Sequence, residues 1–332
     1  MAPLRHGGRL AWARRAFPDA PAPWLDLSTG INPRPWPGRR APSGDLRRLP
    51  DPEDVARLEG LAADAFGARP QAVAACPGAE AALRLLPSLT GARRVAIAAP
   101  TYGGHAEAWA AAGAEVSLVK RDRLAEADAG AVVLVNPNNP DGSATSLVEV
   151  LDAAARLAAR GAWLIVDESF VEVRPELSVA RFADGRLVVL RSFGKFYGLP
   201  GARLGFLVGD ARLAAAMRAR LGDWPLGADA LALGLGAYAD AAWAARARAD
   251  LRWDAARLDR LLKRGGLPPL GGTDLFRLVR APRAERRFAA LAARGILTRP
   301  FTFDPDVLRF GLPGPGDWRR LGAALEACNH EP

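Results

Sequence analysis

The alternation of short apolar runs with helix-like stretches limits the possible folds of this chain most strongly. Short, mostly apolar, strand-like runs occur at 94–100, 115–119, 131–135, 162–168, 187–192 and 203–208. Stretches with helical apolar spacing lie between them, at 79–89, 105–114 and 147–161. Strands that are buried on both faces read as continuous apolar runs, and their alternation with helices favours a parallel arrangement. The sequence therefore predicts an α/β fold, with a mostly parallel central sheet flanked by helices.

The 332 residues are enough for one large core or two modest ones. The segment 51–66 has helical spacing and is followed by Gly67, a typical helix stop. After about residue 210 the pattern is helical, and a small α+β segment then follows, at 273–280, 284–295, 307–312 and 315–328. Residues 1–45 are rich in Pro, Gly and Arg and indicate an irregular arm. We expect a large α/β domain at 46–225 and a small domain formed by 1–45 and 226–332.

The sequence lacks several features that would place the protein in a membrane or in a secretory compartment. It has no run of 18 apolar residues, so we expect no membrane span and no membrane partner. The first 17 residues contain no apolar segment of signal-peptide length, although their arginines leave a transit peptide open. Two cysteines, Cys76 and Cys328, do not make a disulfide framework and fit a reducing compartment. The expectation is a cytoplasmic protein.

The net charge of +9 raises the question of nucleic-acid binding. The arginines are scattered and form no long basic run, so we expect no nucleic-acid partner. Two explanations of the positive net charge remain: a generally heavy use of Arg, and an anionic, phosphorylated substrate. We expect no bound metal, because His6, His105 and His330 are far apart and no Cys-x-x-Cys occurs.

Lys195 is one of three lysines among 45 basic residues. A guanidinium keeps its proton in proteins, whereas a lysine amine can become a nucleophile towards carbonyls and pyridoxal phosphate. Lys195 stands in 192-SFGKFYGLPGARLG-205, after a strand-like run, where Ser192 and Arg203 could both bind a phosphate. A surface lysine is the alternative reading, but this neighbourhood favours a functional amine.

Polar or aromatic residues follow other predicted strands, where ligands bind in open α/β sheets. Asp167 could cap the chain or pair with a protonated pyridine nitrogen. Asn139, in 136-NPNNPDG-142, could be part of a plain turn or donate its amide to a cofactor oxygen. Tyr102 could pack in the core or stack on a flat ring. The free N–H groups at a predicted helix start suit a phosphate, at Gly78, Ala79 and Glu80.

The order of NPNNPDG, DESF and SFGKFYGLPGARLG resembles the class I/II aminotransferase family of fold type I pyridoxal-phosphate enzymes, over nearly the whole chain. The resemblance implies a covalent link between Lys195 and the cofactor, pyridoxal 5'-phosphate, and a homodimer. It also assigns cofactor contacts: Asp167 to the ring nitrogen, Asn139 to the ring oxygen, Tyr102 to the ring face, and Gly78, Ala79, Glu80, Ser192 and Arg203 to the phosphate. Arg309 matches the arginine that binds the substrate α-carboxylate.

Two N-terminal segments, 6-HGG-8 and 26-DLSTGINP-33, resemble the threonine-phosphate decarboxylases of cobalamin biosynthesis within this family. This implies release of CO2 from L-threonine O-3-phosphate to give (R)-1-amino-2-propanol O-2-phosphate. It places His6, Asn32 and Arg299 near the anionic groups of this small phosphorylated amino acid. Phe170 and Leu49 replace tyrosines that are usual in related aminotransferases, which weighs against a histidinol-phosphate aminotransferase.

Two other functions stay open on the residues alone. A histidinol-phosphate-type aminotransferase would need a keto-acid acceptor and would release no CO2. A regulator that binds the cofactor without catalysis would normally add a helix-turn-helix domain, and residues 1–45 are too short and Pro-rich for one. His105 is read as a helix-start or core residue rather than a catalyst.

Overall fold

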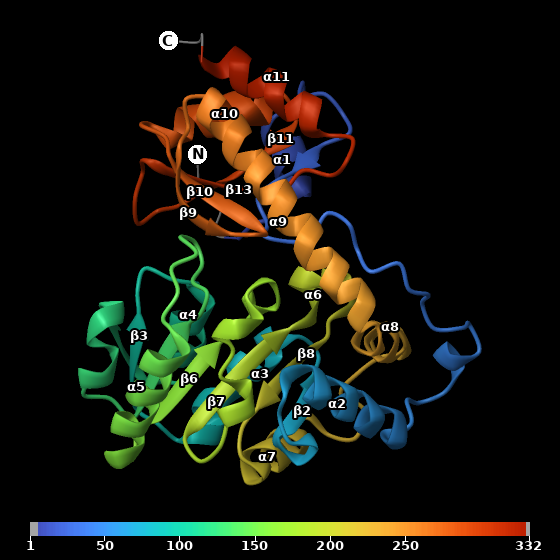
Figure 1. The fold of residues 1–332 in the computed structure, drawn as a ribbon, viewed down its shortest axis with the longest axis vertical. Helices are drawn as coiled ribbons and strands as arrows, with labels where there is room; N and C mark the ends of the chain where they lie inside the picture. The colour runs from blue at the N-terminus through green and yellow to red at the C-terminus, as the bar shows by residue number, and fades with distance from the viewer. Residues whose placement is uncertain (1–5, 330–332) are drawn as a thin grey trace. The chain divides into compact units, whose positions relative to one another are not determined.

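The computed structural model describes residues 6–329, and His330 lies outside this range. The chain forms two compact units (Figure 1). The large unit comprises Trp36–Asn139 and Ala144–Ala245, and the small unit comprises Met1–Pro35, Pro140–Ser143 and Arg246–Pro332. The domain limits expected from the sequence, 46–225 with 1–45 and 226–332, remain a prediction. Within the described residues, no helix is long and apolar enough to cross a membrane.

A seven-stranded sheet runs through the large unit in the order β2-β8-β7-β6-β5-β3-β4 (Figure 1). Its strands are β2 (Val73–Cys76), β3 (Arg94–Ala98), β4 (Glu115–Val119), β5 (Ala131–Val135), β6 (Trp163–Asp167), β7 (Leu187–Ser192) and β8 (Gly205–Val208). All neighbours from β7 through β4 are parallel, and only β8 runs antiparallel to its two neighbours. The predicted mostly parallel α/β sheet is confirmed, although the sequence analysis had missed β2.

Helices cover both faces of this sheet. They are α2 (Pro52–Phe66), α3 (Ala79–Thr90), α4 (Gly104–Ala111), α5 (Leu147–Ala159), α7 (Ala211–Leu221) and α8 (Ala228–Ala239), while the short α6 (Phe193–Phe196) directly follows the end of β7. Residues that typically cap helices are found at the ends of α2 and at the start of α5. Asp51 caps α2, and Gly67 ends it with a left-handed φ of 66°. Ser146 and Glu149 form a reciprocal capping box at the start of α5. Apolar residues of α3, α4 and α7 form one core with the sheet, including the fully buried Trp109.

The small unit contains a four-stranded antiparallel sheet in the order β12-β13-β10-β9. These strands are β9 (Pro269–Thr273), β10 (Phe276–Arg280), β12 (Arg299–Pro300) and β13 (Val307–Gly311). In addition, β1 (Leu25–Asp26) pairs in parallel with β11 (Ile296–Leu297). Three helices belong to this unit, namely α1 (Leu10–Ala16), α10 (Ala284–Ala293) and α11 (Trp318–Asn329), and α9 (Ala241–Arg264) begins in the large unit and ends here. The N-terminal arm is therefore less irregular than its composition indicated.

Candidate active site

Lys195 lies one turn beyond the carboxyl end of β7, in the short helix α6. Its neighbours Gly194 and Phe196 are buried, while Lys195 itself is partly exposed. The Lys195 Nζ atom lies 5.8 Å from the centroid of the Phe170 ring. Gly194 is required here, because a Cβ atom at this position would lie 2.7 Å from Cα of Pro200. The backbone after β7 is thus folded back tightly, and the amine is presented at the sheet edge.

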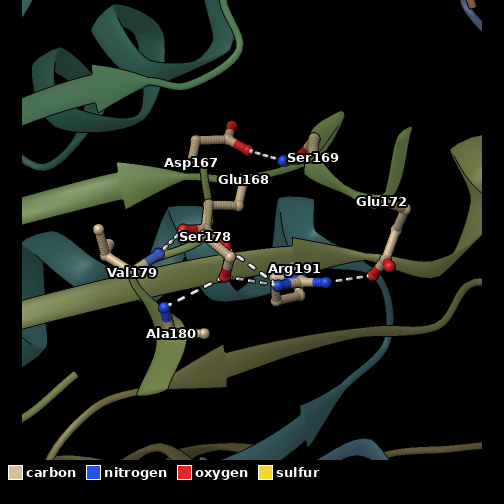
Figure 2. Close-up of polar contacts among 8 residues, drawn as sticks. All are labelled: Asp167, Glu168, Ser169, Glu172, Ser178, Val179, Ala180 and Arg191. Atoms are coloured by element: carbon tan, nitrogen blue, oxygen red, sulfur yellow. Dashed lines mark hydrogen bonds and ion pairs between the residues drawn. The ribbon is translucent and has the colours of Figure 1, made fainter. Parts of the chain in front are cut away.

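Asp167 ends the neighbouring strand β6 and is buried. One carboxylate oxygen, Oδ2, lies 2.9 Å from Nε2 of His105, and the other, Oδ1, accepts a hydrogen bond of 2.9 Å from the backbone N–H of Ser169 (Figure 2). Burial acts to raise the pKa of Asp167, but the bonds from His105 and Ser169 outweigh it and hold the pKa below its usual value. Asp167 is therefore a buried carboxylate that stays ionised at neutral pH.

Four of the residues predicted to bind phosphate come together at the start of α3. Ser192 is paired with Gly205 across β7 and β8, and a Cβ atom at Gly205 would lie 2.3 Å from the backbone nitrogen of Ala79. Gly78 has a φ of 89°, and a Cβ atom there would lie 2.6 Å from Nη2 of Arg203. The two glycines thus let β8 and the Arg203 guanidinium approach the start of α3 closely, where the free N–H groups of the helix lie.

Tyr102 and Glu80 also belong to this edge, but Glu80 has other partners. The Tyr102 hydroxyl donates a 3.2 Å hydrogen bond to Oε2 of Glu80, and Arg84 lies 2.7 Å from Oε1. Burial and the Glu80 carboxylate raise the pKa of Tyr102, so its hydroxyl stays protonated. The side chain of Glu80 is thereby occupied, and its backbone N–H is the group that remains suited to a phosphate.

Asn139 is buried in the turn that follows β5. The turn is held by its other asparagines, since Asn136 bonds both the N–H and the C=O of Thr145. Asn138 accepts a 2.7 Å hydrogen bond from the Thr101 hydroxyl and donates one of 3.0 Å to the Pro100 carbonyl. The segment that carries Asn139 is therefore fixed to the segment that carries Tyr102.

The residues predicted to bind substrate lie in the small unit, where two arginines face each other across β12 and β13, Arg299 opposite Arg309. Arg309 is buried and donates a 2.8 Å hydrogen bond from Nη2 to the carbonyl of Ser28. Burial, and then the nearby Arg299, lower the pKa of Arg309 to about 9. Arg309 is still a cation at neutral pH, but one whose surroundings disfavour its charge.

The N-terminal segments that contain His6 and Asn32 lie in the same unit as Arg299 and Arg309. The Ser28 hydroxyl accepts a 2.8 Å hydrogen bond from the N–H of Gly8, which ties the His6 segment to the 26–32 segment. Asn32 is buried, and its Oδ1 accepts a 2.9 Å bond from the N–H of Arg34. The 26–32 segment passes close to β13, because a Cβ atom at Gly311 would lie 2.2 Å from the Thr29 carbonyl. Arg309, Arg299 and the 26–32 segment are thus held together.

Residues 28–321 match the family described as aminotransferase class I and II. The chain belongs to this family. It is 41% identical to the threonine-phosphate decarboxylase of Pseudomonas aeruginosa, over 97% of both chains. It is 30% identical to the histidinol-phosphate aminotransferase of Stenotrophomonas maltophilia, over 92% of this chain and 89% of that protein. The structure of the Sinorhizobium meliloti histidinol-phosphate aminotransferase in complex with pyridoxal-5'-phosphate has a TM-score of 0.82 and 20% identity, over 98% of both chains, and so the same fold.

In this member of the family, the sequence analysis missed the contact of His105 with the candidate site residue Asp167. The interpretation of His105 as a helix-start or core residue is confirmed, because it is the second residue of α4 and is fully buried. No pattern in the sequence links His105 to Asp167, because the two residues are 62 positions apart and meet only through the order of the strands. Among residues 6–329, no group of three His, Cys, Asp or Glu side chains is arranged to hold a metal ion.

Proposed function

We propose that this protein is a pyridoxal 5'-phosphate-dependent decarboxylase that converts L-threonine O-3-phosphate to (R)-1-amino-2-propanol O-2-phosphate and CO2. The observation that carries the proposal is the 41% identity to a threonine-phosphate decarboxylase over almost the whole of both chains. The matched histidinol-phosphate aminotransferase is more distant, at 30%. The product would enter cobalamin biosynthesis, and we further propose a homodimer located in the cytoplasm.

The residues of the large unit fit the cofactor. The start of α3, which Gly78 and Gly205 let Arg203 and β8 approach closely, would bind the phosphate, with the N–H groups of Ala79 and Glu80 and the Ser192 hydroxyl as donors. The ionised Asp167 would hold a proton on the ring nitrogen. Asn139 would donate to the ring oxygen, Tyr102 would cover a ring face, and Lys195 would bind the aldehyde carbon. When bound, the cofactor supplies an electron sink for the bond that breaks at the substrate Cα.

The residues of the small unit would orient the substrate. Only a Cα bond that stands perpendicular to the cofactor ring overlaps with its π system, so orientation decides between loss of CO2 and loss of a proton. Arg309 would bind the carboxylate by its guanidinium fork. Arg299, His6 and Asn32 would lie near the anionic groups of the substrate. Released from the aldehyde carbon by the substrate amine, Lys195 would hold the proton that is delivered to Cα.

The test is incubation of the purified protein, reconstituted with pyridoxal 5'-phosphate, with L-threonine O-3-phosphate and no keto acid. We expect CO2 and 1-amino-2-propanol O-2-phosphate in equal amounts. An absence of CO2, together with amino transfer that requires 2-oxoglutarate, would identify a histidinol-phosphate-type aminotransferase instead. The same preparation in light scattering should have the mass of two chains.

A further inference from the structure

A cluster of buried charges lies beside the candidate cofactor site and has no part in the function proposed above. Arg191, on β7, is 3% exposed. Its Nη1 donates hydrogen bonds of 3.0 Å to Oε2 of Glu168 and 3.1 Å to Oγ of Ser178, and its Nη2 donates to Oε1 of Glu172 (Figure 2). The Phe66 ring covers the guanidinium, with its centroid 4.2 Å from Cζ. One arginine therefore joins strand β7 to two glutamates.

Both carboxylate oxygens of Glu168 accept hydrogen bonds. Its Oε2 also accepts a 2.7 Å hydrogen bond from the Ser178 hydroxyl, and its Oε1 accepts one of 2.6 Å from the N–H of Val179. The Ala180 N–H donates a 3.2 Å bond to Oγ of Ser178. The cluster consequently fixes the segment that leaves β6 and returns towards β7.

Stability alone is a poor reason for such a cluster. Burial raises the pKa of Glu168, which records the cost of removing its charge from water. Buried ion triads can often be replaced by apolar residues of similar volume with no loss of stability. What an apolar replacement would lose is directionality, since a guanidinium fork fixes the positions of its carboxylates.

Two of the cluster residues, Glu168 and Arg191, are immediate chain neighbours of candidate site residues. Glu168 directly follows Asp167, the last residue of β6, and Arg191 precedes Ser192 on β7. Successive side chains of a strand point to opposite faces, and Figure 2 shows Asp167 directed away from the cluster. The two strand ends are further joined by a 2.9 Å bond from the Glu168 N–H to the Leu190 carbonyl. A shift of Arg191 relative to Glu168 would therefore shift Ser192 relative to Asp167.

We propose that Glu168, Arg191 and Glu172 are positioning residues that set the offset between the ends of β6 and β7, and so between Asp167 and the Ser192–Lys195 segment. The proposal rests on the proposed use of pyridoxal 5'-phosphate. That cofactor is rigid across its ring, and it would be held by Asp167 at one end and by Ser192 and Lys195 at the other. A misplacement of about 1 Å in such a site can cost about 100-fold.

The test is a triple variant, Glu168→Leu, Arg191→Met and Glu172→Leu, compared with wild type by titration of the apoprotein with pyridoxal 5'-phosphate. We expect the thermal midpoint of the apoprotein to be retained, and the dissociation constant of the cofactor to rise about 10- to 100-fold. The circular dichroism of the bound cofactor should also change, because its ring is held differently. The single variant Arg191→Lys keeps the charge but loses the fork, and it should show the same changes to a smaller degree.

The matched control replaces a salt bridge in the small unit, Arg277→Met with Asp259→Leu, whose Nε–Oδ1 distance is 2.6 Å. We expect this variant to bind the cofactor as wild type does. A folded triple variant with wild-type affinity and dichroism would overturn the positioning role and leave the proposed function intact. If the triple variant does not fold, wild-type affinity and dichroism in Arg191→Lys would overturn it equally. Failure of wild type to bind the cofactor would overturn the proposed function itself.

Discussion

Asp167 in the large unit and Arg309 in the small unit are both buried. The surroundings of Asp167 favour its charged form, whereas those of Arg309 disfavour it. Hydrogen bonds from His105 and Ser169 lower the pKa of Asp167 and so favour its charged form. Burial and the facing Arg299 lower the pKa of Arg309, which disfavours its charged form. The first site has its charge stabilised before any ligand arrives, as a site for a resident cofactor requires. The second would gain most from an anion that is brought by the substrate.

The largest effect that this comparison predicts is for Asp167→Asn. Asparagine carries no charge to hold a proton on the cofactor ring nitrogen, so kcat should fall about 1,000-fold. The measurement is steady-state CO2 release at saturating cofactor. Asp128→Asn is the control, because Asp128 forms an exposed salt bridge with Arg94 that is worth little. Equal rates for Asp167→Asn and wild type would remove the central role of the carboxylate.

Arg309→Met is the corresponding test of the small unit. Loss of a buried cation that binds a carboxylate should raise KM for L-threonine O-3-phosphate about 100-fold. The affinity for pyridoxal 5'-phosphate should stay unchanged, and so should the thermal midpoint without substrate, because the lost charge was unfavourable in the free protein. Arg280→Met, at an exposed arginine of β10, is the control. A large loss of cofactor affinity in Arg309→Met would contradict the distinction between the two sites.

His105→Phe would sharpen the account of Asp167. Because its pKa is below the usual value, Asp167 contributes stability that is present above its unfolded pKa of about 3.9 and is lost as the pH falls through its folded pKa. Without His105 the effect of burial should dominate and raise the pKa of Asp167. We expect cofactor affinity about tenfold weaker than wild type, and a further loss as the pH falls from about 7 to 5. Titration at several pH values measures this, and a pH profile parallel to wild type would refute it.

The smallest expected effect is at the phosphate. Ser192→Ala removes one hydroxyl donor and leaves Arg203 and the N–H groups of α3 in place. The loss of one hydrogen bond to a charged group costs about 1.5 kcal/mol at the low end of its range, which corresponds to about tenfold weaker cofactor binding. Equilibrium titration should find this with kcat nearly unchanged at saturating cofactor. A loss as large as that of Asp167→Asn would show that Ser192 does more than hold phosphate.

Much of the large unit could be predicted because its strands are buried on both faces. The run 131–135 is apolar throughout and is the fully buried β5. By contrast β2, with the sequence VAAC, is short and built of small residues, so nothing in its pattern separates it from a loop. The antiparallel direction of β8 could not be inferred either, since the sequence of a strand does not record its direction.

The candidate site was predictable where a motif fixes both residue type and spacing, as for Lys195, Ser192 and Arg203. Partners that come from distant segments were not. His105 and Asp167 are 62 positions apart, and Arg191 and Glu168 are 23 apart. Their contacts depend on the order of the strands in the sheet. The burial of Arg191 could not be predicted either, because nothing in the sequence distinguishes it from the other 41 arginines.

The most direct test of the central claim, that Lys195 binds the cofactor, is reduction of the yellow reconstituted protein with borohydride, followed by digestion and mass spectrometry. The chain has only three lysines, Lys120, Lys195 and Lys263, so the attachment site can be identified without ambiguity. We predict one phosphopyridoxyl group per chain, on the peptide that contains Lys195, and none in Lys195→Ala. Attachment at Lys120 or Lys263, or no attachment in wild type, would contradict the account.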